Sequence, residues 1–208
     1  ALAYLPRGTA FSVGPLVNTY NESTLGYLAE RGARRVSLPP EWPMASIEVL
    51  ARRGAELGVI VEVWGHGRAP LAIAGRCYHA RLEGRSKDNC QFACEADLDG
   101  LTVDTIDGEA FLAINGVQTL SAAYVSAIRQ VEALTEAGVG ALRLQPQAYH
   151  FIALTGIWHD RITGEIDGDA AEAAIEGLYP GVQLADGFIG GAKGADWSGR
   201  ARAAMARL

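Results

Sequence analysis

Val59-Ile60-Val61-Glu62-Val63-Trp64 is the stretch of sequence that decides the fold. Its residues are mainly β-branched and apolar, which is typical of a buried strand, and Glu62 is the one charged residue inside it. The strand leads directly into a segment that holds every cysteine of the chain: Cys77, Cys90 and Cys94. We therefore predict a central strand at 59–64, followed by a cysteine-bearing loop of about residues 65–96.

On either side of this strand, apolar runs alternate with helical patterns. We predict parallel strands near residues 10–17, 35–38, 59–64 and 141–144, and a further strand at 111–118. Helical periodicity predicts helices ending at Gly32 and Gly58, one from Ser121 to Gly138 that carries Tyr124, and weaker ones near 149–158, 170–178 and 198–208. Such alternation indicates an α/β fold with a parallel sheet, either doubly wound or part of a (β/α)-barrel.

Composition narrows the class of protein. The 208 residues, 49% of them apolar, suit a single domain at 1–208. A net charge of -6 disfavours nucleic acid as a partner, and no apolar run is long enough to span a membrane. Three cysteines without an export signal favour a reducing, cytoplasmic location. The first residues, Ala-Leu-Ala-Tyr-Leu without an initiator Met, lead us to expect a fragment that lacks the N-terminal part of the fold.

The three cysteines are either packing thiols or ligands. The loop between Cys77 and Cys90 is too polar to be core, and its arginines and lysine favour the thiolate form that binds metal. The paired Cys-x-x-Cys knuckles of a structural zinc site are absent. Three thiolates suit an iron–sulfur cluster whose fourth ligand lies elsewhere. The nearby His66 and His79 are each a spare ligand, a proton donor or, as is commoner for a loop histidine, a surface residue.

The remaining motifs do not indicate a particular catalytic or binding function. The sequence has no His-Glu-x-x-His, no Gly-x-Ser-x-Gly and no phosphate-binding Gly-x-x-x-x-Gly-Lys. The glycine-rich 187–194 segment is either a turn or a phosphate loop, and the turn is the simpler interpretation because no strand precedes it. Asp97-Leu-Asp-Gly100 and Asp107-Gly108 are typical of hairpin turns, whereas the ligand spacing of a calcium loop is missing.

Several of these motifs together resemble a known family. Glu62-Val-Trp through Gly67, Pro70-Leu-Ala and Gly75-Arg-Cys77 resemble the signature of the collagenase-like peptidase family of unknown catalytic type. The Cys-x12-Cys-x3-Cys spacing with Lys87-Asp-Asn-Cys90 is similar to the UbiV subfamily, which acts in oxygen-independent ubiquinone biosynthesis. The likeness covers most of residues 9–147.

The resemblance implies the C-terminal portion of a (β/α)8-type barrel and a 4Fe–4S cluster. It maps three of the four cluster ligands onto Cys77, Cys90 and Cys94, and places the fourth cysteine upstream of this chain. It further implies a heterodimer with a UbiU-like homologous subunit, hydroxylation of a ubiquinone precursor, and prephenate as the oxygen donor. Glu62, Arg68 and Arg76 are the candidate catalytic residues; the two arginines would contact either the donor's carboxylates or the negative charge of the cluster.

Three classes of function follow from the sequence. The first is an iron–sulfur subunit of an anaerobic ring hydroxylase. The second is a peptidase, as the family name suggests, although no nucleophile–base pair is evident and cysteines that bind metal cannot also be nucleophiles. The third is an RNA-modifying hydroxylase, which the acidic balance disfavours.

Overall fold

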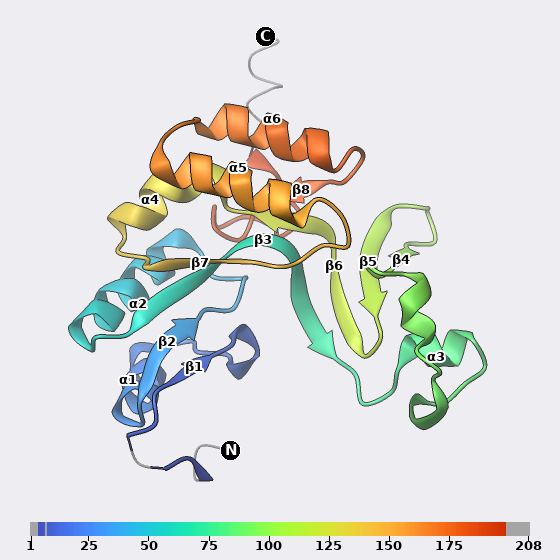
Figure 1. Ribbon diagram of the computed structural model, residues 1–208, viewed down its shortest axis with the longest axis horizontal. Coiled ribbons are helices and arrows are strands. Elements are labelled where there is room, and N and C mark those ends of the chain that lie inside the picture. The colour runs from blue at the N-terminus through green and yellow to red at the C-terminus, as the bar shows by residue number, and fades with distance from the viewer. Residues whose placement is uncertain (1–3, 7, 199–208) are drawn as a thin grey trace.

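One long central strand joins the parallel part of the sheet to its antiparallel part. The computed structural model describes residues 4–6 and 8–198, and in it β3 runs from Ile60 to Ile73 (Figure 1). The other strands are β1 (Phe11–Val13), β2 (Ala33–Ser37), β4 (Leu101–Asp104), β5 (Ala110–Asn115), β6 (Gln118–Ser126), β7 (Ala141–Leu144) and β8 (Leu184–Ala185). Because β3 continues well past Trp64, the first part of the expected 65–96 loop is strand, and the irregular chain that carries the cysteines begins after it.

The first half of β3 lies in a parallel sheet of the expected kind. Its strand order is β1-β2-β3-β7, with all neighbours parallel. The helices are α1 (Glu22–Glu30), α2 (Met44–Glu56), α3 (Tyr78–Leu82), α4 (Val131–Glu136), α5 (Phe151–Thr163) and α6 (Gly168–Leu178). These bounds confirm the helices expected to end at Gly32 and Gly58 and those expected near residues 149–158 and 170–178. The one expected at 198–208 lies almost wholly outside the described residues.

Local sequence explains where these elements begin and end. The Asn21 side chain accepts a hydrogen bond from the Thr24 amide at 2.8 Å, which caps α1. Gly32 follows that helix with φ +104, and a Cβ there would lie 2.5 Å from the Thr9 carbonyl oxygen. The strand expected at 10–17 is shorter than predicted, because Pro15 starts a 3-10 turn after β1 and cannot donate to a sheet.

The second half of β3 departs from a simple parallel fold. From His66 onward it pairs with β6, which is antiparallel to it, and β5 and β4 continue as an antiparallel meander. The strand expected at 111–118 is confirmed as β5 up to Asn115, where it ends because Gly116, with φ +59, turns the chain into β6. The helix expected from Ser121 is wrong in its first part: Tyr124 lies on β6, and the helix is α4.

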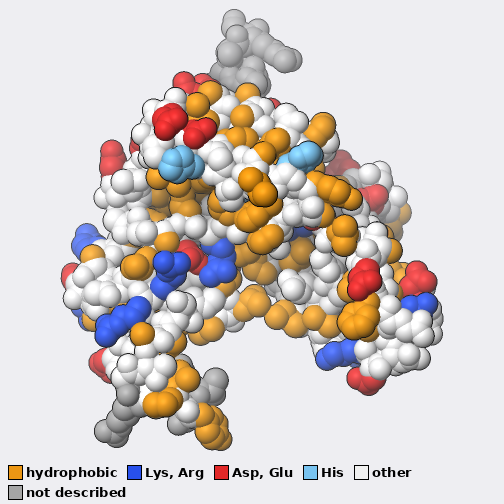
Figure 2. Space-filling view, in the orientation of Figure 1, with side chains coloured by type: hydrophobic (Ala, Val, Ile, Leu, Met, Phe, Trp, Pro, Cys, Tyr) orange, Lys and Arg blue, Asp and Glu red, His pale blue; other side chains and the backbone are white. Residues whose placement is uncertain are grey.

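The sheet is open, so the barrel expected from the resemblance is not confirmed. Its path among the described strands is β1-β2-β3-β6-β5-β4, with β7 beside β3 and β8 beside β6. On the parallel half, Val36, Val61 and Val63 join one core with buried residues of the helices, including Leu50 and Trp158. The opposite face of these strands carries charged residues instead, and Figure 2 shows Lys and Arg side chains gathered beside a hollow lined by hydrophobic ones. No helix among the described residues is long and apolar enough to cross a membrane.

Candidate functional site

The three cysteines lie in a compact irregular region at the far end of β3, which we call the cysteine segment (residues 77–97). Cys77 is buried at the start of α3, where its sulfur accepts a long hydrogen bond from the Ala80 amide at 3.5 Å. Two 3-10 turns, Lys87–Asn89 and Ala93–Ala96, pack against α3 and carry the chain past Cys90 and Cys94. Figure 1 shows α3 with β4 and β5, apart from α1, α2 and β1.

This segment has almost no apolar core of its own. Its buried apolar residues are Cys77 and Ala80, while large side chains such as Leu82 and Phe92 are 68% and 69% exposed. Gln91 and Phe92 both have positive φ, of 48° and 53°, although neither is glycine. Two consecutive left-handed residues cost free energy, and such strain is retained where other interactions determine the backbone. The segment between Cys90 and Cys94 is therefore a strained turn.

The thiols are free and do not form a ready-made single-ion site. None of the three is in a disulfide. Among the described residues, the cysteines form no group of three ligand atoms that all lie within 4.8 Å of one another. A single zinc ion with Zn–S bonds of about 2.3 Å would need sulfurs closer than that. Cysteine thiolates are the usual ligands of iron–sulfur clusters, so the donor type suits such a cluster.

His79 ties the cysteine segment to the β5–β6 hairpin. Its Nε2 lies 2.9 Å from Asp97 Oδ2, and its Nδ1 accepts a hydrogen bond from the Gly116 amide at 3.2 Å. Nδ1 is an acceptor here, so the ring proton is on Nε2 and is donated to Asp97. The thiol of Cys94 lies beside the same glycine. Both nitrogens of His79 are occupied, so this histidine is a structural residue and not the spare ligand considered from the sequence.

The candidate Glu62 is far from the cysteines along the same strand. Its side chain is only 6% exposed and lies between two arginines on adjacent strands, Arg143 at 2.7 Å and Arg35 at 3.5 Å. Arg143 Nε also lies 3.3 Å from Ser37 Oγ. Between Glu62 and the end of β3 there is roughly 35 Å of extended chain at about 3.3 Å per residue. The structure therefore places Glu62 in a separate ion-pair cluster on the open face of the parallel strands.

The two candidate arginines differ in burial and in the groups that surround them. Arg76 is exposed in the turn that follows β3. Arg68 is part-buried on β3, donates from Nη1 to the carbonyl oxygens of Ser121 and Ala122, and lies 5.0 Å above the ring of Tyr124. Arg68 lines a cleft of about 730 Å³, and no cysteine lines that cleft. The structure therefore gives no support for a joint role of these two arginines.

His66 lies in the core, so the surface position that the sequence favoured for it is wrong. His66 is fully buried, and its ring lies 5.6 Å from that of Tyr124 and 6.1 Å from that of Tyr179. Neither ring nitrogen has a hydrogen-bond partner among the described residues. Burial lowers the pKa of His66 to about 4, so the ring is neutral at pH 7. Desolvation, followed by the negative charge of Asp99, raises the pKa of Tyr124.

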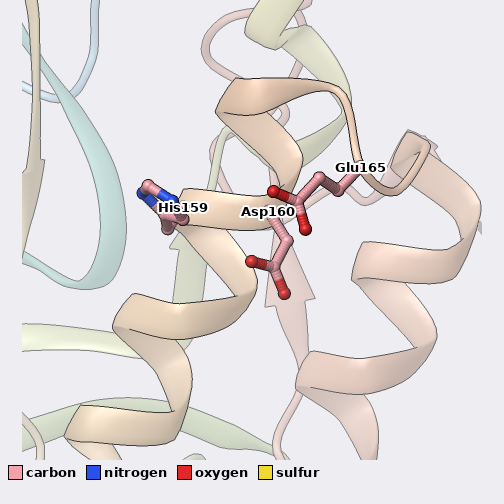
Figure 3. Close-up of side chains that lie close together, drawn as sticks. All are labelled: His159, Asp160 and Glu165. Atoms are coloured by element: carbon pink, nitrogen blue, oxygen red, sulfur yellow. The ribbon is translucent and has the colours of Figure 1, made fainter.

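One other group of side chains has the chemistry of metal ligands. His159, Asp160 and Glu165 lie at the end of α5, with potential ligand atoms all within 4.8 Å of one another. Figure 3 shows the carboxylates of Asp160 and Glu165 close together, with His159 to one side. His159 and Glu165 are exposed, and Glu165 accepts a long hydrogen bond from Thr163 at 3.4 Å. We assign no function to this group, because nothing on the described surface encloses it.

Comparison with known proteins identifies one family. The family model described as Peptidase family U32 matches residues 4–175, most of the chain. The match includes the cysteine segment, Glu62, Arg68 and the whole of β3 to β7. No solved structure matches the chain.

Proposed function

This chain belongs to peptidase family U32, and on that premise we propose that it is an iron–sulfur protein similar to UbiV. In this proposal it acts with a UbiU-like homologous subunit in the oxygen-independent hydroxylation of a ubiquinone precursor, with prephenate as the oxygen donor. Cys77, Cys90 and Cys94 would hold a 4Fe–4S cluster together with a fourth cysteine from outside this chain. A bound cluster would supply one-electron redox chemistry at the cysteine segment.

The observation that carries this proposal is the contrast between the thiols and their surroundings. All three cysteines of the chain lie unpaired in one segment that buries little apolar surface and contains two strained residues, Gln91 and Phe92. Small irregular regions of this kind commonly depend on a metal or a disulfide for their structure. The Arg85 side chain donates to the Cys90 carbonyl oxygen at 3.2 Å, which adds a positive charge beside the second ligand. That charge favours an anionic thiolate centre.

The surface of the same region supports a protein partner. Large apolar side chains are exposed on and next to the cysteine segment, and they include Tyr78, Leu82, Phe92 and Leu98. Exposed apolar groups in this number are a common property of interfaces. A homologous subunit docked here would cover these residues and exclude water from the thiols.

The arginines contribute differently to the proposed reaction. Arg68 lines a cleft that no cysteine lines, which favours contact with a carboxylate ligand over stabilisation of cluster charge. Arg76 is exposed at the turn leading to Cys77, where it would stabilise the negative charge of the cluster. Glu62 is held by Arg143 and Arg35, so we propose that it organises the parallel strands and takes no direct part in chemistry.

A peptidase is the second candidate, because the family description names that activity. A peptidase of the cysteine or serine type needs a nucleophile hydrogen-bonded to a base. Among the described residues, no such bond joins a cysteine or serine to a histidine, and both nitrogens of His79 are already engaged. The described geometry therefore supports the peptidase less well than the iron–sulfur protein.

The proposal is tested in cells. The gene would be deleted, and ubiquinone would be measured after growth with and without oxygen. We expect loss of ubiquinone only without oxygen, restored by the wild-type gene but not by a Cys90→Ala copy. Unchanged ubiquinone in the anaerobic deletion strain would contradict the proposal and favour the peptidase.

A further inference from the structure

A large cleft lies between the antiparallel strands and the chain around β8, and the cysteine segment does not line it. Its volume is about 730 Å³, within the range of sites for small organic molecules. One wall comes from β3, β4, β5 and β6, and the other comes from residues 181–183, 185, 188 and 194–195. Apolar groups dominate the lining, with Leu71, Phe111, Val125, Val182 and Phe188 as the larger side chains.

The glycine-rich 187–194 segment builds part of this cleft and is not a phosphate loop. Its amides are used within the turn: Ala192 donates to the Gly187 carbonyl oxygen at 2.7 Å, and Gly191 donates to that of Phe188 at 2.9 Å. The Phe188 ring packs directly on Gly194, where an added Cβ would lie 2.3 Å from the ring. Gly194 is therefore needed for close packing, which fixes Phe188 in the cleft wall.

Arg68 is the one charged residue among those that line the cleft. None of the ion pairs between described residues includes it, and its Nε is buried without a hydrogen-bond partner in the described part of the chain. Its Nη1 is held by the carbonyl oxygens of Ser121 and Ala122, which also line the cleft. A part-buried guanidinium without a carboxylate partner is costly, and an anionic ligand would offset that cost.

We propose that this cleft binds a monocarboxylate carried on an apolar body, such as an aromatic ring on a short alkyl chain, with the carboxylate at Arg68. The guanidinium binds carboxylates with directional, charge-assisted hydrogen bonds, and the apolar walls accept the body of the ligand. A single negative charge matches the single positive charge of the site. This inference deepens and rests on the carboxylate contact that the proposed function gives Arg68, and its test is separate from that of the cluster, because such binding would occur whether or not the cysteines hold iron.

The test compares 4-phenylbutyrate with 4-phenylbutan-1-ol, which share the apolar body and differ in the head group. Isothermal titration calorimetry on the wild-type protein should show the carboxylate binding about tenfold or more tightly than the alcohol. Arg68→Gln should remove this preference and leave binding of the alcohol unchanged. The matched control is Arg52→Gln, which removes the same charge from an exposed position on α2 and should keep the preference.

A second variant keeps the test informative if Arg68→Gln fails to fold. Phe111 is 60% exposed and lines the cleft, so Phe111→Ser should fold and should weaken binding of both compounds. Equal affinity of the wild-type protein for the two compounds, or no binding of either, would overturn the proposal. Tighter binding of 4-phenylbutyl phosphate than of the carboxylate would overturn the choice of head group. An unchanged preference in Arg68→Gln would overturn the role of that residue.

Discussion

The buried His66 should make the stability of the protein depend on pH in a way that one substitution removes. Its pKa is about 4 in the folded protein and 6.5 when solvated. Because the folded pKa is the lower one, the unfolded state takes up the proton first, and stability is lost as the pH falls from 6.5 towards 4. The full difference corresponds to about 3 kcal/mol, of which about 2 kcal/mol would be lost by pH 5.

His66→Phe is the matched perturbation. The ring of His66 lies between those of Tyr124 and Tyr179, so a phenyl ring fits the same aromatic surroundings without titrating. Free energies of unfolding from urea titrations at pH 7.5 and pH 5.0 should fall by about 2 kcal/mol more in the wild type than in the variant. The wild type and the variant have the same Asp and Glu residues, so the contribution of these residues to the pH dependence of stability cancels in the comparison. An equal fall in the two proteins would refute the reasoning and show that His66 is hydrated or paired in solution.

Two other substitutions test the strands around β3. Gly67→Ala should destabilise the protein by roughly 3 kcal/mol in urea titrations, because φ is +122 and the new Cβ would lie 2.5 Å from that of Gln145; a cost below about 1 kcal/mol would show that Gln145 moves freely. Arg143→Met should lower the free energy of unfolding by about 2 to 3 kcal/mol, because it leaves the buried Glu62 with only the 3.5 Å contact to Arg35. Adding Glu62→Gln to that variant should recover most of the loss, and no recovery would mean that packing rather than charge is responsible.

The parallel half of the fold was predictable because its signals are local. The β-branched run at 59–64 predicts one strand, and Gly32 and Gly58 mark the ends of two helices; the structure confirms all three elements. The antiparallel half was mispredicted because its signals conflict. Tyr124 has the spacing of a helical stripe with the residues of α4, but pairing with Arg68 on β3 places it in a strand. Pairing with β3 determined the conformation of this segment. That pairing joins residues too far apart in the sequence for a local pattern to show it.

The same distinction applies to the candidate site. The three cysteines are close together in the sequence, and residues close in sequence stay in the same region of an irregular loop. The cysteine segment could therefore be located from the sequence. The partners of Glu62 and the cleft at Arg68 come from distant parts of the chain. Arg143 contacts Glu62 only because β7 pairs with β3, and the wall formed by Phe188 meets β6 through β8. Contacts between such distant residues depend on the order in which the strands pair, and the sequence pattern predicted only the parallel part of that order.

The measurement that tests the central claim most directly is the iron content of the natural protein purified without oxygen. The account predicts about four irons and four acid-labile sulfides per chain, with visible absorption that is lost in Cys77→Ala, Cys90→Ala and Cys94→Ala alike. Circular dichroism of these variants should retain the α/β signal, because the main core lies among β1–β3 and the helices, away from the thiols. Stoichiometric zinc without iron, or iron that remains after all three substitutions, would contradict the account.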